Sequence, residues 1–115
     1  MAFVIKADKN YNWPVTISEP MDGGGFNDQK VRVKFKMLKQ SRIDEIIKNE
    51  AEEDADILRD VLVGWDEDAF KDEAGNAIPF NDENKDLILS VPFVRGALVK
   101  SFFESIAGKA FKRKN

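Results

Sequence analysis

The groups in this chain that are best able to do chemistry are carboxylates, which gather in two short runs. Asp66-Glu67-Asp68 could ligate a hard cation such as Ca²⁺, which prefers oxygen ligands. In a calcium loop of the EF-hand type that starts at Asp66, however, Lys71 takes the glycine position and Ala77 takes the position of the bidentate glutamate. Residues 52–56 could hold such a cation only weakly, and a solvated acidic turn is the simpler explanation. The sequence therefore predicts no metal site.

Other catalytic groups are scarce because the chain has no histidine and no cysteine. It therefore lacks the commonest general base, the commonest transition-metal ligand and a thiol nucleophile. No serine lies in a Gly-x-Ser-x-Gly motif, and the glycines at residues 23–25 lack the Gly-Lys-Ser/Thr of a phosphate loop. An enzyme that uses two carboxylates as acid and base is a hypothesis that only their abundance supports. We expect no catalytic residue, no cofactor and no enzymatic activity.

One strand-like segment concentrates positive charge. In residues 29–38, Lys30, Arg32, Lys34 and Lys36 alternate with apolar side chains, so the four basic groups project from one face. Such a face could contact phosphates or an acidic protein surface. No aromatic side chain lies on it, the acidic middle of the chain would repel a nucleic-acid backbone, and the pI is about 5.0. We assign the four residues to protein binding, with a small nucleic-acid-binding accessory protein as the alternative.

Charge is divided into blocks along the chain, although the formal net charge is only -3. Residues 29–42 hold six basic groups and no acid, residues 44–73 hold thirteen acids and three basic groups, and residues 93–115 hold six basic groups and one acid. Blocks of opposite sign speed the encounter with charged partners and allow copies to associate head to tail. Pairing within the fold is the simpler explanation for any one pair of blocks, so a homo-oligomer is left open.

Two strands are predicted to position the basic face. Residues 12–18 are rich in β-forming side chains, and Pro14 is typical of an edge strand or a strand start. Residues 19–28 include three consecutive glycines and are predicted to form a loop. Together with residues 29–38, these segments predict a long antiparallel hairpin, to which residues 3–5 could add a third strand or a loose arm.

Helical periodicity follows the hairpin. Ser41 is predicted to cap a first helix, with Asp44 completing a capping box. The acidic residues 49–56 are expected to break or bend this helix. Residues 56–63 are predicted to form a second helix, which Gly64 ends.

A short irregular segment, residues 65–80, and two further helices complete the predicted chain. The turn residues Ala74-Gly75-Asn76 indicate a small hairpin within this segment. Asn81 is predicted to cap a helix over residues 82–89. Pro92 is predicted to begin the last helix and Gly108 to end it.

These patterns predict an α+β fold, with an N-terminal antiparallel β-hairpin followed by three or four short helices. We expect a single domain over residues 1–115, with a β-hairpin region (1–40), a helical region (41–108) and a basic mobile tail (109–115). The expected core consists of large apolar side chains from every part of the domain: Val31, Val33, Phe35, Ile57, Val61, Trp65, Leu87, Leu98 and Phe102.

The last helix carries the clearest signal for contact with other proteins. Its apolar residues cover an arc wider than the roughly 100° stripe of a surface helix, so the helix must be buried on more than one side. Either the chain's own hairpin or a partner, including a second copy, could cover that arc. The candidate partner-binding residues on this helix are Val94, Leu98, Val99, Phe102, Phe103 and Ile106.

Signals for export or membrane insertion are not found in the sequence. No run approaches the roughly 18–20 apolar residues that span a membrane, and the N-terminus lacks the basic region of a signal peptide. The absence of cysteine also fits a reducing compartment. We expect a cytoplasmic protein with no membrane partner.

Several segments between Asp56 and the C-terminus follow one another in an order that resembles the tail assembly chaperones of long-tailed (siphovirus, lambda-like) bacteriophages and prophages. The basic hairpin resembles this family in its general character, but not residue by residue. The segments that carry the resemblance are Asp56-Ile57-Leu58, Val61-Leu62-Val63, Gly64-Trp65, Asp72-Glu73-Ala74-Gly75-Asn76-Ala77-Ile78-Pro79-Phe80, Asn84, Pro92-Phe93-Val94-Arg95, Ala97, Leu98, Phe102, Phe103 and Gly108-Lys109-Ala110-Phe111-Lys112-Arg113-Lys114-Asn115.

The resemblance implies a non-enzymatic role in the cytoplasm of a bacterial host. Proteins of this family bind the tape-measure protein before tail assembly, keep it soluble and extended, and recruit tail-tube subunits around it. Many of them are also made in a longer form by ribosomal frameshifting near the end of the reading frame. For this chain, the resemblance implies the tape-measure protein and the tail-tube protein as partners.

Overall fold

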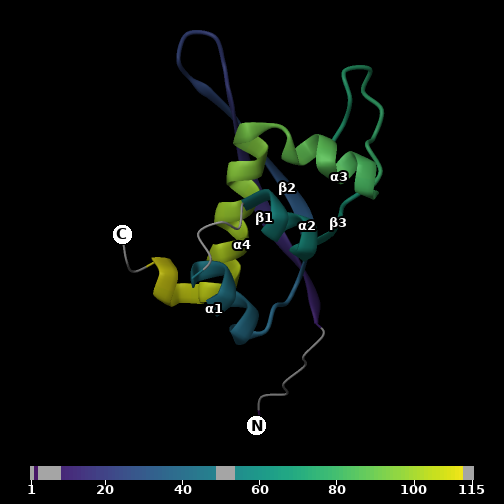
Figure 1. The fold of residues 1–115 in the computed structure, drawn as a ribbon. Helices are drawn as coiled ribbons and strands as arrows, with labels where there is room; N and C mark the ends of the chain where they lie inside the picture. Colours follow the sequence, from purple (N-terminus) through teal and green to yellow (C-terminus); the bar gives the residue numbers. More distant parts are fainter. Residues whose placement is uncertain (1, 3–8, 49–53, 113–115) are drawn as a thin grey trace.

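The computed structural model describes residues 2, 9–48 and 54–112, all with their side chains except residues 47, 54, 55 and 107–112. The α+β class and the N-terminal antiparallel hairpin predicted from the sequence are confirmed. The elements in chain order (Figure 1) are β1 (Asn10–Pro20), β2 (Phe26–Lys36), α1 (Gln40–Lys48), α2 (Asp54–Val61), β3 (Leu62–Trp65), α3 (Asp82–Leu89) and α4 (Pro92–Lys112).

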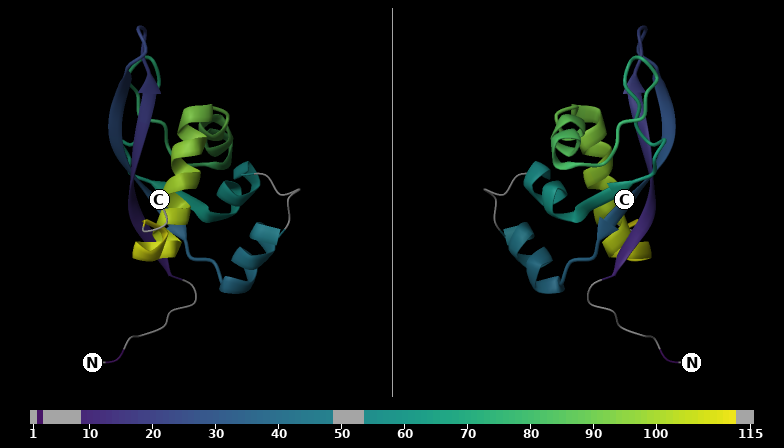
Figure 2. Two further views of the ribbon diagram at one scale, coloured as in Figure 1. Left: turned by 90° about the vertical axis from the view of Figure 1, so that its left-hand side faces the viewer. Right: turned by 90° about the vertical axis from the view of Figure 1, so that its right-hand side faces the viewer.

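Strands β1 and β2 form a long hairpin that extends past the helices (Figures 1 and 2). They pair without interruption from Asn10 opposite Lys36 to Pro20 opposite Phe26. The loop between them is shorter than predicted, because both strands continue into the segment expected to be irregular. Gly23 in this loop has a φ of 93°, a left-handed conformation that side chains other than glycine rarely adopt.

The outer edge of β1 is blocked by proline. The Met21 N–H donates to the Gly25 oxygen, and the Met37 N–H donates to the Lys9 oxygen. These two bonds identify which alternate residues of β1 form hydrogen bonds with β2. Odd-numbered residues of β1 therefore bond to β2, and even-numbered ones face the free edge. Pro14 faces that edge and has no N–H to offer another strand. The predicted edge strand is confirmed.

The third strand is β3, which the sequence pattern had predicted as the end of the second helix. Helix α2 ends at Val61, and Gly64 pairs with Lys34 of β2 instead of ending the helix in a left-handed conformation. A short apolar run fits a helix or a strand equally well, and here pairing with β2 decides between them. The alternative third strand, residues 3–5, lies outside the described residues.

Among residues 9–48 and 54–112, helices α1 to α4 lie on one side of the sheet and no element covers the opposite side (Figure 2). Helix α4 packs along β1, and α2 and α3 contact α4. The Phe35 and Phe102 rings meet edge to face, with centroids 5.3 Å apart. The buried apolar residues are Val15, Ile17, Val33, Phe35, Ile46, Ile57, Leu58, Val61, Leu62, Ile88, Leu89, Val94, Leu98 and Phe102.

One predicted core residue, Leu87, is 54% exposed, so that prediction is wrong. Helix α3 is rotated against α4 so that the next two residues, Ile88 and Leu89, are buried in place of Leu87. Val31 and Trp65 are half-buried and pack against the core, and the other predicted core residues are buried.

The predicted helix starts have different outcomes. Asn81 caps α3 as expected, because its Oδ1 accepts a hydrogen bond from the Asn84 N–H at 2.7 Å. Ser41 does not cap α1, because the helix begins one residue earlier and the Ile43 N–H donates to the Lys39 oxygen. Ser41 therefore lies inside the first turn.

The last helix is longer than predicted. Helix α4 continues past Gly108 to Lys112, so the predicted end at Gly108 is wrong. A single glycine costs a helix about 1 kcal/mol relative to alanine, which does not end it when no left-handed cap follows. The expected basic tail is thus helical over residues 109–112, and residues 113–115 lie outside the described residues.

Trp65 anchors the loop between β3 and α3. The Trp65 Nε1–H donates to the Ile78 oxygen at 2.9 Å. The Phe70 and Phe80 rings meet the Trp65 ring edge to face, with centroids 5.1 Å and 4.9 Å away. The predicted small hairpin is present as a bridge between Lys71 and Ala77. Trp65 therefore packs under this loop and anchors it to the core.

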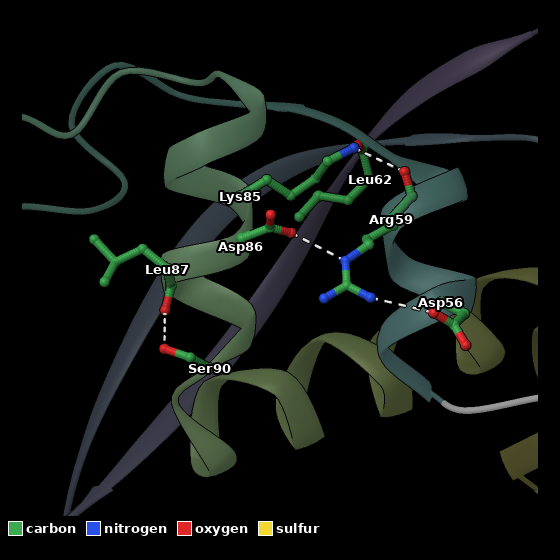
Figure 3. Close-up of polar contacts among 7 residues, drawn as sticks. All are labelled: Asp56, Arg59, Leu62, Lys85, Asp86, Leu87 and Ser90. Atoms are coloured by element: carbon green, nitrogen blue, oxygen red, sulfur yellow. Dashed lines mark hydrogen bonds and ion pairs between the residues drawn. The ribbon is translucent and has the colours of Figure 1, made fainter.

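Helices α2 and α3 are joined by polar contacts at the α2–β3 junction (Figure 3). The Lys85 ammonium donates to the backbone oxygens of Arg59, at 2.7 Å, and Leu62, at 3.1 Å. Carbonyls at the end of a helix lack partners within the helix, so Lys85 satisfies this end of α2 from a neighbouring element. The Arg59 Nε also donates to Asp86 at 3.0 Å, and Asp86 raises the pKa of Arg59.

Replacing Lys85 with methionine is expected to lower the free energy of unfolding by about 1–2 kcal/mol, because two carbonyls lose a charged donor. Urea denaturation followed by circular dichroism measures this change. Lys100→Met, at an exposed position on α4, is the matched control and should change stability by less than about 0.5 kcal/mol. Equal stabilities for the two variants would show that Lys85 does not hold the junction.

Candidate protein-interaction surfaces

The four basic residues of β2 project from the uncovered side of the sheet. Lys30, Arg32, Lys34 and Lys36 are all exposed, and they alternate with Val31, Val33 and Phe35 on the helix-covered side. The predicted amphipathic strand is therefore present, and the structure places the four basic side chains along one face. We call this surface the basic sheet face.

Two of these four residues are tied to acids of the same chain. Arg32 forms an ion pair with Asp66 at 3.0 Å, and Lys36 forms one with Asp60 at 3.2 Å. In the part of the chain that the structure describes, Lys30 and Lys34 have no carboxylate within ion-pair distance. Pairing of charge blocks within the fold thus accounts for part of the basic face, and Lys30 and Lys34 keep their charge available.

A shallow pocket of about 400 Å³ adjoins the basic sheet face. Lys30 and Arg32 line it from β2, Pro14 from β1, and Asp66 and Asp68 from the loop after β3. Its lining thus mixes both signs of charge. This mixture suits a polar segment of a protein better than a polyanion, because the two carboxylates would repel phosphates.

The candidate residues of α4 divide into two groups. Val94, Leu98 and Phe102 are buried in the chain's own core. Val99, Phe103 and Ile106 are half-buried on the flank of the helix. The hairpin therefore covers one side of the wide apolar arc, as one of the two sequence hypotheses expected. Among the candidate residues with described side chains, this half-buried flank has apolar surface left to offer a partner.

Ile106 also lines a groove at the open end of the hairpin, which we call the strand-end groove. Its volume is about 440 Å³, within the roughly 300–1,000 Å³ range of ligand pockets. It lies where β1 begins and β2 ends, beside α1 and α4. Its walls include Tyr11, Trp13, Leu38, Ile43, Ser105 and Ile106.

One hydrogen bond fixes the wall of the strand-end groove. The Tyr11 hydroxyl and Ser105 Oγ are 2.7 Å apart, and Ser105 Oγ also donates to the Phe102 oxygen. Burial raises the pKa of the Tyr11 phenol above its ordinary value, while the bond to Ser105 lowers it to a smaller extent. The phenol therefore stays neutral at physiological pH and acts as a link between β1 and α4.

The described residues offer little for a metal or a membrane. Among them, no three His, Cys, Asp or Glu side chains gather closely enough to hold a metal ion. No helix in the same ranges is long and apolar enough to cross a membrane.

Two exposed apolar residues at the far end of the hairpin did not figure among the predicted site residues. Phe26 is 68% exposed and Met21 is 50% exposed. The signal for Phe26 was present in the sequence, because it shares the even-numbered phase of Lys30 and Lys34 and must lie on the uncovered face. The predicted strand began at residue 29 and therefore missed it.

Comparison with models of known protein families, with curated proteins and with solved structures finds no match for this chain. The assignment of function therefore depends on the sequence segments and on the surfaces described above.

Proposed function

We propose that this protein is a tail assembly chaperone of a long-tailed bacteriophage or prophage. It would bind the tape-measure protein in the host cytoplasm and help to recruit tail-tube subunits. The observation that carries the proposal is the ordered set of segments between Asp56 and the C-terminus that resembles this family.

The structural roles of these segments support the proposal. Gly64-Trp65 lies in β3 and anchors the acidic turn through the bond from Trp65 to Ile78. The Asn84 side chain donates to the Pro79 oxygen, which joins the acidic turn to α3. Segments that resemble the family thus contact one another, as expected if they form one functional unit.

The available surfaces suit a long amphipathic client. A tape-measure chain is long and helical, and its exposed apolar stripes would aggregate without a partner. A protein that coats it needs apolar contact area together with charges that tolerate sequence variation. Val99 and Phe103 on the flank of α4 supply apolar surface, and Lys30 and Lys34 supply charge that is not used within the described part of the fold.

Co-expression with a tape-measure protein, the proposed client, tests the proposal. The tape-measure protein should remain soluble and co-purify with the chain, and it should aggregate when expressed alone. A client that stays insoluble in the presence of the folded chain would contradict the proposal.

Reversing the two available charges is expected to weaken this complex. The double variant Lys30→Glu, Lys34→Glu should raise the Kd for the tape-measure protein roughly tenfold, because each exposed contact contributes at most about 1 kcal/mol. The matched control is Lys48→Glu, Lys71→Glu, which makes the same change of net charge at exposed positions outside the basic sheet face. Fluorescence anisotropy at two salt concentrations measures both. Equal affinities for the two double variants would exclude the basic sheet face from the contact.

The second candidate, a nucleic-acid-binding accessory protein, is favoured only by the exposed Lys30 and Lys34. It predicts retention on DNA or RNA at low salt, with a steep loss of affinity as salt is raised. Absence of retention at low salt would eliminate it.

A further inference from the structure

The tip of the hairpin, residues 19–28, combines exposed apolar side chains with acidic ones. Met21 and Phe26 stand at its end, and Glu19, Asp22 and Asp28 flank them, all exposed. The segment holds no basic residue. Phe26 is 68% exposed, because no element in the described part of the chain covers it. Its side chain therefore contributes little buried apolar area to the stability of the fold. Such a tip is suited to insertion into another surface.

The strand-end groove lies at the opposite end of the same two strands and has complementary chemistry. Six of its ten lining residues are apolar or aromatic, and one of them, Met37, is itself 39% exposed. Lys9 lines it and Lys39 is exposed next to Leu38. Within one molecule, Lys9 and Lys39 cannot reach the acidic residues of the hairpin tip. Eleven paired residues, about 37 Å of strand, separate the two ends of the hairpin.

We propose that the hairpin tip of one copy of this chain docks in the strand-end groove of the next. Phe26 and Met21 enter the apolar groove, and Glu19, Asp22 and Asp28 approach Lys9 and Lys39. The occupant is a second copy because both complementary halves are carried by this one chain. A groove of about 440 Å³ has room for two apolar side chains.

The contact is heterologous, because the surface used by one copy differs from the surface used by its neighbour. Such a contact builds an open row of copies unless the rotation between them closes a ring. Edge-to-edge pairing of β1 is disfavoured as a route to association, because Pro14 removes a donor from that edge. The proposal does not depend on the identity of any client.

Sedimentation velocity on the full chain over a concentration series tests this proposal. The wild-type chain should form oligomers that grow in size with concentration. Phe26→Asp at the tip and Met37→Asp in the groove lining should each raise the Kd of self-association roughly 10- to 100-fold. Both side chains are exposed, so circular dichroism should show an unchanged fold. Leu87→Asp, at a similarly exposed site on α3, is the matched control and should associate like the wild type.

Mixing the two variants gives the decisive result. The Phe26→Asp chain keeps an intact groove and the Met37→Asp chain keeps an intact tip, so an equimolar mixture should form a heterodimer and stop there. A contact between two tips would leave Met37→Asp associating like the wild type, and that result overturns the proposal. A wild-type chain that stays monomeric at all concentrations, or a mixture that stays monomeric while the wild type associates, also overturns it.

Discussion

Replacing Phe102 with alanine is expected to lower the free energy of unfolding by about 3–5 kcal/mol. Phe102 is fully buried, and its ring contacts both Phe35 of β2 and Phe103 of α4. Removing the ring leaves a cavity between the sheet and the longest helix, where few side chains can move to fill it. Urea denaturation measures the change, and the loss is large compared with the total stability of a small domain.

The control for this variant is Phe26→Ala, which removes the same ring from the hairpin tip. Because Phe26 is 68% exposed, the monomer should change in stability by less than about 0.5 kcal/mol. The measurement is made at low concentration, so that the proposed association of copies does not contribute to it. Similar losses for the two variants would mean that α4 does not pack on the sheet through Phe102.

Replacing Trp65 with alanine is expected to cost about 2–3 kcal/mol and to release the loop between β3 and α3. The variant loses a hydrogen bond to Ile78 and ring contacts with Phe70 and Phe80. The expected cost is smaller than for Phe102 because Trp65 is only half-buried. Hydrogen exchange of residues 66–80, together with urea denaturation, measures the two effects.

Glu67→Ala, an exposed change in the same loop, is the control for Trp65→Ala and should leave both readouts at wild-type values. If the loop of Trp65→Ala exchanges as slowly as that of the wild type, Trp65 does not anchor it.

Features fixed by local chemistry could be predicted from the sequence. The alternation in residues 29–38 predicted the strand β2, although it runs from Phe26 to Lys36, and the Asn81 cap predicted the start of α3. The turn at Ala74-Gly75-Asn76 formed as expected because the Asp72 carboxylate accepts the N–H groups of Ala74 and Asn76. In each case the residues that determine the structure lie within a few positions of one another.

Features decided by contacts between distant segments could not be predicted. Strand β3 exists because Gly64 and Trp65 pair with β2, about thirty residues earlier in the chain. The exposure of Leu87 follows from how α3 is rotated against α4, and its own periodicity did not determine that rotation. A sequence pattern therefore predicts whether a segment is a helix or a strand more readily than it predicts which other element the segment packs against.

The candidate surfaces show the same limit. The sequence indicated that α4 is apolar over a wide arc, but only the packing separates buried Leu98 from half-buried Val99. It also indicated four basic groups on one face, but not that Asp66 and Asp60 would neutralise two of them. The strand-end groove was not predicted, because its walls come from three segments that are far apart in the sequence: residues 9–13, 37–43 and 105–106.

The most direct test of the proposed function is the binding of the purified chain to a purified tape-measure protein, the partner that the proposal assigns to it, measured by isothermal titration calorimetry. We predict saturable binding that weakens as salt is raised, and a negative heat-capacity change from the burial of apolar surface. Two folded proteins that give no binding heat at any temperature or salt concentration, and no co-sedimentation, would contradict the account.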